Sequence, residues 1–320
     1  MLDQKNLLQA LKEQYSLQPT QIKSFGSIWK VFTSSDLYIL KVFRRSQTEL
    51  AALANTLILL EQAGFSQFIP TLPNQKGKLF WEFEAKFWSL SPWYNGQRPD
   101  FKVAFDLTQT ATLLGKLHQT ANTLDSCTRE PLAHLLHDWE TKLSFLKEIP
   151  ARLNQPTINR IDRQTLNLSN HFFTQATSCY QALVPLADVK FSVGFCHHDP
   201  APRNIIIYQN KWYLLDLEFS GRGYFLNELA NLIRRALQLN LWAAWVIPTI
   251  LNGYQNERPL TETETKVLPY LIAFPRQFWR FCHQRYYENL KRNEHYFAHR
   301  LWEITNAEKS RERWMLEQFP

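Results

Sequence analysis

A short segment of the chain gathers polar side chains that can do acid–base and metal chemistry around an apolar stretch. Residues 194–219 read GFCHHDPAPRNIIIYQNKWYLLDLEF. The candidate side chains in it are those of His197, Asp199, Asn204, Asp216 and Glu218. Carboxylate and amide oxygens are ligands that suit Mg²⁺, and a carboxylate can also accept the proton of an attacking hydroxyl. The segment therefore indicates a divalent-cation site beside a general base.

The apolar stretch is predicted to be a β-hairpin. Residues 205–208 and 212–215 form two four-residue strands around the loop QNK, and a three-residue hairpin loop is common. Equal arms would set Asn204 directly beside Asp216, because opposed residues of an antiparallel pair have Cα atoms roughly 4.5–5.5 Å apart. The hairpin would then present an amide oxygen and a carboxylate at one end, with Asp199 in the loop before it.

Taken singly, each of these residues is more often a turn former or a cap than a catalyst. Taken together, they follow the order of a kinase catalytic loop: a base Asp, a metal-binding Asn, and a second metal-binding Asp beyond a short hairpin. The combination favours a phosphate-transfer site over a set of turn residues.

The region before this segment is predicted to begin with a small β-rich lobe. A helix over about 3–15 precedes two strands in SIWKVFT and LYILKVFR, which flank a polar turn. Ser46 and Glu49 form a capping box for a helix that ends at Gly64. A second hairpin follows in GKLFWEFEAKFWSLSPW.

The linker YNGQRPD separates this lobe from a helical region. Asp100 is expected to cap a helix that runs to about residue 121 and buries Phe105, and Pro131 to lie in the first turn of the next helix. We therefore predict an α+β, two-lobed fold, with a nucleotide-binding lobe over 1–93 and a helical lobe with the catalytic loop and substrate pocket over 94–320.

Composition excludes several classes of protein. Nine glycines form neither a Rossmann nor a P-loop motif, and four scattered cysteines form no C-x-x-C pair. The net charge of +7 is mild, and the basic C-terminal region is interrupted by Glu, so nucleic-acid binding is not expected. The charged N-terminus and short apolar runs predict a soluble, cytoplasmic chain without membrane contact.

HHDPAPRN and WYLLDLE resemble the catalytic block of the aminoglycoside phosphotransferase and choline kinase superfamily, which has a protein-kinase-like fold. More narrowly, the chain resembles the bacterial spore-coat CotS-like family. Outside the block the resemblance includes GSIWKV, LYILKVFRR, LANLIRRAL and LPYLIAFPRQFW, and it covers residues from about 10 to 315.

The resemblance implies that Asp199 is the catalytic base and that Asn204 and Asp216 bind Mg²⁺. His197 would brace the metal-binding segment. Glu218 occupies a second acidic position, where a supporting role and a plain surface Glu are both open.

The resemblance also implies how ATP would be bound. Lys41 would contact the ATP phosphates, with Glu49 either as its ion-pair partner or only as the capping-box residue. The adenine would be bound by backbone groups of Ser91 and Trp93, flanking Pro92, which has no N–H. The expected nucleotide loop, KSFGSIWK, holds only Gly26 and departs from a glycine-rich cradle.

The expected function is that of an ATP- and Mg²⁺-dependent kinase acting on a hydroxyl of a small molecule. A polycationic antibiotic is a poor candidate for a net basic chain, and the sequence does not identify the acceptor. The alternative is a kinase-fold scaffold, associated with spore-coat proteins and located in the coat, with weak or no catalytic activity.

Overall fold

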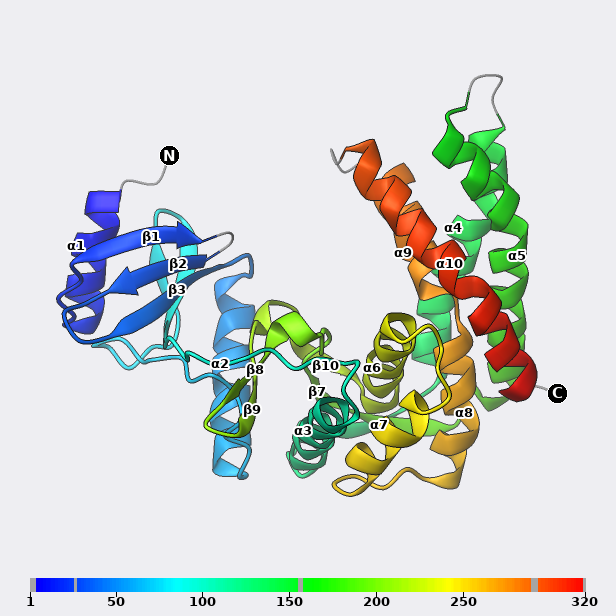
Figure 1. Cartoon of the computed structure of the whole chain (residues 1–320). Coiled ribbons are helices and arrows are strands. Elements are labelled where there is room, and N and C mark those ends of the chain that lie inside the picture. Colours follow the sequence, from blue (N-terminus) through cyan, green and yellow to red (C-terminus); the bar gives the residue numbers. More distant parts are fainter. Residues whose placement is uncertain (1–3, 26–27, 155–157, 289–292, 319–320) are drawn as a thin grey trace. The chain divides into compact units, whose positions relative to one another are not determined.

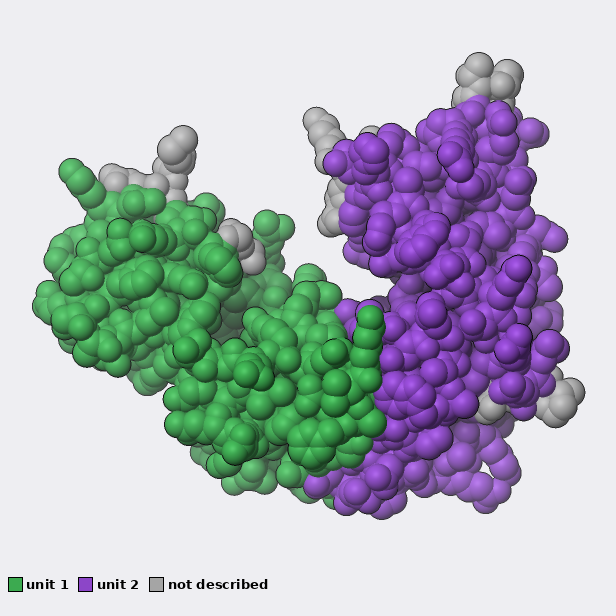
Figure 2. Space-filling model, in the orientation of Figure 1, with its two compact units in different colours: residues 1–127, 194–223 green, residues 128–193, 224–320 purple. Residues whose placement is uncertain are grey.

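The contacts between residues divide the chain into two compact units, each made of two segments (Figure 2). The computed structural model describes residues 4–25, 28–154, 158–288 and 293–318. The sheet unit comprises residues 1–127 and 194–223, and the helical unit comprises residues 128–193 and 224–320. The segment with the polar candidates thus groups with the N-terminal residues, which a boundary near residue 93 did not anticipate.

The sheet unit contains a five-stranded antiparallel sheet in the order β1–β2–β3–β5–β4 (Figure 1). Its strands are β1 (Gln21–Phe25), β2 (Ile28–Phe32), β3 (Leu37–Phe43), β4 (Trp81–Phe83) and β5 (Lys86–Pro92). Both predicted hairpins, β2–β3 and β4–β5, are present. Strand β1 was not predicted, because Ile22 is its one buried residue and its sequence therefore lacks a clear alternation.

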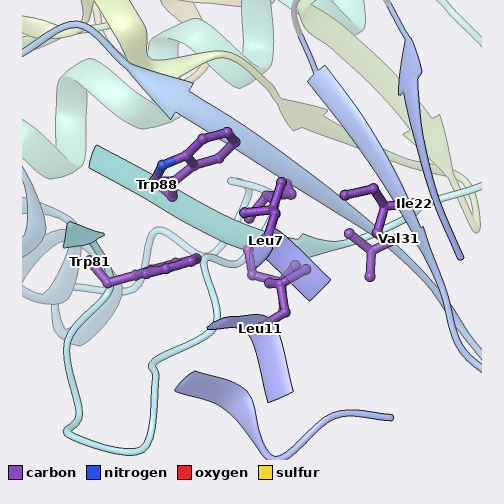
Figure 3. Packing of buried hydrophobic residues seen from close by; sticks show 8 residues of the cluster. Leu7, Leu11, Ile22, Val31, Trp81 and Trp88 are labelled. Atoms are coloured by element: carbon purple, nitrogen blue, oxygen red, sulfur yellow. The ribbon is translucent and has the colours of Figure 1, made fainter. Parts of the chain in front are cut away.

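A hydrophobic cluster holds helix α1 (Gln4–Tyr15) against this sheet (Figures 1 and 3). Its buried members are Leu7, Leu11, Ile22, Val31, Leu40, Trp81, Trp88 and Leu90. Leu7 and Leu11 are fully buried and lie one helical turn apart, so they project from one face of the helix. Burying such a side chain contributes about 1.5–3 kcal/mol, which is why the predicted amphipathic N-terminal segment folds as a helix on the sheet.

Helix α2 (Gln47–Gln62) begins directly after the predicted cap, Ser46, and ends two residues before the predicted stop, Gly64. The Ser46 hydroxyl accepts a hydrogen bond from the Glu49 N–H at 3.3 Å, and the Ser46 N–H donates to the Glu49 carboxylate at 2.8 Å. Gly64 follows the helix with a φ of 98°, a conformation that favours glycine. The capping box is confirmed.

Helix α3 (Ala104–Asn122) begins later than predicted, and the expected cap at Asp100 is wrong. The Asp100 carboxylate accepts from the Lys102 N–H at 2.9 Å, and its carbonyl accepts from the Val103 N–H at 2.9 Å. These bonds close a separate turn before the helix. Phe105, expected on the buried face, is 62% exposed.

The sheet unit also contains the hairpin of β8 (Ile205–Tyr208) and β9 (Lys211–Leu214). The 3₁₀ turns of the described residues are η1 (Val184–Leu186), η2 (Pro202–Asn204) and η3 (Leu217–Phe219), and the last two flank the hairpin. Strands β7 (Lys190–Cys196) and β10 (Gly221–Tyr224) each contain a point at which the chain passes from one unit to the other.

The helical unit consists mainly of helices that pack pairwise. They are α4 (Ala133–Leu153), α5 (Arg160–Leu183), α6 (Phe225–Leu239), α7 (Val246–Gln255), α8 (Glu262–Ala273), α9 (Arg276–Tyr286) and α10 (Glu294–Gln318). Helix α4 packs against α5, α5 and α6 pack against α8, and α9 packs against α10. Strand β6 (Thr128–Pro131) pairs with the first residues of β7. Pro131 therefore ends a strand. The prediction that Pro131 lies in the first turn of α4 is wrong.

The mixed α+β class is confirmed, with a β-rich N-terminal region and a helical C-terminal part. Within the described ranges, no helix is both long enough and apolar enough to cross a lipid bilayer.

The core of the sheet unit generates a stability prediction. Leu40→Ala removes a fully buried side chain from the centre of strand β3 and should lower the free energy of unfolding by about 3 kcal/mol. Leu59→Ala, in α2, is the matched control, because Leu59 is 39% exposed. Urea denaturation would measure both. Equal losses in the two variants would contradict the assignment of Leu40 to the core.

Candidate active site

The β8–β9 hairpin has a two-residue turn, and its register differs by one residue from the prediction. Gln209 and Asn210 both have positive φ, 49° and 58°, as a tight type I′ turn requires. Ile205 pairs with Leu214, and the Leu215 N–H donates to the Asn204 carbonyl at 2.8 Å. Asn204 is therefore opposite Leu215, and Asp216 is one residue further along the chain.

The hairpin is held on both sides by other segments of the sheet unit. On the β9 side, the Leu214 N–H donates to the Gln67 carbonyl at 2.8 Å, and the Ile69 N–H donates to the Leu214 carbonyl at 3.2 Å. On the β8 side, Gln97 and Ile207 exchange backbone hydrogen bonds of 3.0 and 2.7 Å. Contacts from the predicted linker and from the loop before β4 thus fix the hairpin in place.

Gly96 is required where the linker meets the hairpin. A Cβ at this position would lie 2.2 Å from the Ile207 carbonyl oxygen, which is much closer than van der Waals contact allows. The adjoining Tyr94 ring lies 4.4 Å from the Tyr208 ring, measured between centroids. The linker YNGQRPD is therefore a packed element that positions the hairpin.

Asp199 is fixed by its neighbours in the loop before the hairpin. The Asn204 side-chain amide donates to the Asp199 carboxylate at 2.7 Å and to its carbonyl at 3.0 Å. The Arg203 guanidinium donates to the same carboxylate oxygen at 2.5 Å. His197, which is fully buried, accepts from the Asp199 N–H at 3.3 Å through Nδ1, and its Nε2 lies 2.6 Å from the Leu215 carbonyl.

Lys41, on strand β3, forms an ion pair with Asp216. Its ammonium also lies 3.7 Å from the Glu218 carboxylate. Glu218 is held by a second contact to the same strand region, since its carboxylate accepts from the Arg44 N–H at 2.9 Å. The structure thus brings together a strand lysine and two acids that lie far from it in sequence.

Asp216 has an unusual backbone conformation. Its φ of 61° and ψ of 70° lie in the left-handed region, which non-glycine residues rarely adopt and which costs of the order of 1 kcal/mol or more. Burial tends to raise the pKa of its carboxyl, but the hydrogen bond and charge of Lys41 outweigh this, and the pKa lies below its ordinary value. The local strain and the shifted pKa both indicate a functional position.

Glu49 is not the partner of Lys41, so the first of its two predicted roles is wrong. Its carboxylate accepts from the Ser46 hydroxyl at 2.6 Å and from the Ser46 N–H, and these hydrogen bonds lower its pKa. The capping box accounts for Glu49, and Glu218 takes the place of the second acid beside Lys41.

The predicted adenine contacts are wrong in register. The Trp93 N–H, expected to bind adenine, donates to the Leu37 carbonyl at 2.9 Å. Because hydrogen-bonded pairs alternate in an antiparallel ladder, Ser91 also bonds to its partner Ile39, and Pro92 is at an outward-facing position. The sequence identified the segment around Pro92. It could not predict how this segment pairs with strand β3, and that pairing decides which backbone groups point outward.

Several residues of the site were not predicted. One is Arg203, which lies four residues after Asp199 and forms an ion pair with it. Arg45, whose Nε donates to the Glu218 carbonyl at 2.8 Å, had no sequence signal. Gly26, the glycine of the expected nucleotide loop, lies outside the described residues.

The donor set fits a hard divalent cation such as Mg²⁺. Asn204 uses its amide nitrogen to bind Asp199, so its oxygen is the atom that could bind a metal. Asp216 and Glu218 supply carboxylate oxygens within the same unit. Oxygen ligands of this kind, with one or two carboxylates, are those that Mg²⁺ prefers.

The sequence model of a phosphotransferase enzyme family, APH, matches residues 27–261, well over half of the chain. The chain belongs to this family. The match spans the Lys41 strand and the whole Asp199–Glu218 segment of this APH-family protein. The resemblance to the aminoglycoside phosphotransferase and choline kinase group is confirmed, and the narrower CotS-like resemblance stays a prediction.

Solved structures of kinases share the fold of this APH-family protein. An aminoglycoside phosphotransferase from Alicyclobacillus acidocaldarius has a TM-score of 0.80 at 17% identity, over 97% of this chain and 94% of that one. An amicoumacin kinase in complex with AMP-PNP and Ca²⁺ has a TM-score of 0.63 at 16% identity, over 100% and 95%. A choline kinase from Streptococcus pneumoniae has a TM-score of 0.60 at 17% identity, over 97% and 98%.

The contact at Gly96 generates a prediction about the hairpin. Gly96→Ala should displace the linker from Ile207 and lower stability by roughly 1–3 kcal/mol, the usual cost of overpacking. Gly221→Ala is the control, because a Cβ there meets nothing within 4 Å. Thermal unfolding and amide exchange at Ile207 would measure the effect. Unchanged exchange at Ile207 in Gly96→Ala would contradict the proposed clash.

The shifted pKa of Asp216 generates a pH prediction. A folded-state pKa below the ordinary 3.8 means that the ionised carboxylate stabilises the fold above that pH, and that this is lost as the pH falls through the lowered pKa. The stability difference between wild type and Asp216→Asn should be largest near neutral pH and shrink below 3.8. Urea denaturation across this range measures it.

Lys41→Met serves as the control for the pH experiment, because it removes the main opposing charge. In the Lys41→Met background, the change in stability caused by Asp216→Asn should depend much less on pH. A wild-type difference that stays constant as the pH falls would contradict the ion pair as the cause.

Proposed function

We propose that the protein is an ATP- and Mg²⁺-dependent phosphotransferase that acts on a hydroxyl group of a small molecule. The observation that carries the proposal is the grouping of Lys41, Asp216 and Glu218 with the Asp199–Asn204 pair inside one compact unit. Membership of the phosphotransferase family supports the reaction class.

Asp199 is proposed as the catalytic base. Its side chain is only 17% exposed, and its Oδ2 already accepts from Arg203 and Asn204. We propose that this carboxylate accepts the hydroxyl proton in the orientation that these two hydrogen bonds fix. A base held in one orientation lowers the entropic cost of reaching the transition state.

Asn204 and Asp216 are proposed to hold Mg²⁺, with Glu218 in support and His197 bracing the segment. When bound, the ion would neutralise the charge on the phosphates. The Ca²⁺ in the amicoumacin kinase complex supports the binding of a divalent ion by this fold. The strained, left-handed backbone conformation of Asp216 would then serve to direct its carboxylate toward the ion.

Lys41 is proposed to contact the ATP phosphates. Without nucleotide its ammonium is bound by Asp216 and Glu218, which hold it on the inner part of strand β3 at 17% exposure. The phosphates of ATP carry several negative charges and accept charge-assisted hydrogen bonds, so the lysine can turn to them while the acids remain close by.

The adenine is proposed to bind through the Pro92 carbonyl and the Tyr94 N–H. These groups flank Trp93 and point away from strand β3, because Trp93 pairs with Leu37. The contact needs no N–H from Pro92 and so agrees with the residue found there. The AMP-PNP in the amicoumacin kinase complex supports nucleotide binding by this fold.

On the basis of the sequence resemblance we also propose a CotS-like function, a cytoplasmic location and an association with spore-coat proteins. The acceptor is proposed to be a small hydroxylated molecule. Nucleic acid and membrane are not proposed as partners.

The proposal predicts Mg²⁺-dependent binding of ATP. ATP with Mg²⁺ should raise the melting temperature, and Asp216→Ala should remove this shift because it removes a metal ligand. Asp199→Asn should retain binding but lower slow ATP hydrolysis by about 100-fold or more, as loss of a general base does. Thermal shift and ADP release measure the two effects.

Asp125→Asn is the control, since Asp125 is an exposed aspartate of the same unit. It should leave both readouts at the wild-type level. No shift at millimolar ATP with Mg²⁺ would sink the proposal and favour a kinase-fold scaffold without turnover.

A further inference from the structure

A cationic pocket lies wholly within the helical unit. It has a volume of about 70 Å³ and is lined by Asp138, Trp139, Lys142, Asn227, Arg234, Phe274 and Arg276. Since a buried water needs only about 10–15 Å³ of such space, the pocket has room for several waters or one small ionic group. Its residues come from helices α4 and α6 and from the junction of α8 and α9.

The lining of the pocket carries more positive than negative charge. Lys142, Arg234 and Arg276 are cations, and Asp138 is the one carboxylate among the lining residues, all of which the structure describes. Asp138 forms an ion pair with Lys142, one turn away on α4. With three cations and one carboxylate, the lining residues carry a net formal charge of +2.

Arg234 is the most deeply placed of these cations and is 7% exposed. It donates to the Leu271 carbonyl and to the Asn231 side-chain oxygen, both of which are neutral acceptors. Arg276 donates to the same Asn231 oxygen, so one amide holds two guanidinium groups in place. A buried charge with neutral partners is costly, which is difficult to explain if the residue only connects α6 to α8.

The cations also affect one another. Burial lowers the pKa of Arg234 well below its usual range, and the charges of Arg276 and Arg311 lower it further. Burial likewise lowers the pKa of Lys142; the Asp138 carboxylate opposes this, whereas Arg276 and Arg234 add to it. A negative charge in the pocket would relieve this repulsion.

An aromatic wall completes the pocket. Trp139 and Phe274 are stacked, with ring centroids 4.0 Å apart, and both are buried. The Lys142 ammonium also lies 4.9 Å from the centre of the Trp279 ring. Lys142 and Arg234 are thus held by packed neighbours, whereas Arg276 is exposed to solvent.

We propose that this pocket binds the oxyanion group of a small molecule, a carboxylate or a phosphate, through Lys142, Arg234 and Arg276. The planar guanidinium groups match the paired oxygens of either anion, and Lys142 adds a point charge. Asn227 supplies a neutral polar group at the same place. The site is separate in the chain from the residues proposed for phosphate transfer, and it does not depend on that function.

The test is titration of the full chain with inorganic phosphate and with acetate, without nucleotide, at an ionic strength held constant with NaCl. Trp139 lines the pocket, so saturable changes in tryptophan emission should accompany binding. Lys142→Gln and Arg276→Gln should each weaken binding about tenfold, as expected for the loss of one charge-assisted contact. The anion that binds more tightly identifies the chemical class of the ligand.

Lys266→Gln is the matched control, since Lys266 forms an i,i+4 pair with Glu262 on an exposed helix face of the same unit, as Lys142 does with Asp138. It should bind phosphate as wild type does. Asp216→Ala should also leave phosphate affinity unchanged, which separates this result from any failure of ATP binding. Failure of both anions to bind, or wild-type affinity in Lys142→Gln and Arg276→Gln, would overturn the proposal.

Discussion

The register of the β8–β9 hairpin is the constraint on which the candidate active site depends. A two-residue turn with positive φ at Gln209 and Asn210 fixes which residues of the two strands oppose each other. That register places Leu215 opposite Asn204. The Leu215 carbonyl then reaches the His197 ring, and the next residue, Asp216, turns toward Lys41. A slip of one residue would reverse the direction of every side chain that follows.

The ion pair between Lys41 and Asp216 joins this hairpin segment to the five-stranded sheet. Glu218 strengthens the connection through the Arg44 backbone, and Arg45 donates to the Glu218 carbonyl. Acids that would otherwise repel one another are thus held beside a shared lysine. Lys41, Asp216 and Glu218 could bind phosphates and a metal ion, and their mutual contacts also stabilise the unit. Binding of a metal ion or phosphates would therefore compete with these stabilising contacts.

Much of this arrangement could be predicted from the sequence, because local rules govern it. The capping box at Ser46 and the hairpins of the sheet follow from short-range patterns. The contact between Asp199 and Asn204 also follows from spacing, whereas the predicted pairing of Asn204 with Asp216 was wrong by one residue. What could not be predicted depends on pairing between distant segments: the partner of Lys41, the outward-facing groups beside Pro92, and the clash that requires Gly96.

The sheet unit is discontinuous in the chain, and this affects how the protein is made. Residues 194–223 complete the unit but are separated from residue 127 by the first segment of the helical unit. Since a ribosome adds roughly 5–20 residues per second, the early part must wait several seconds for its missing hairpin. During that interval the backbone groups of Gln67 and Gln97 lack the hairpin partners Leu214 and Ile207, and they are natural places for a chaperone to bind the nascent chain.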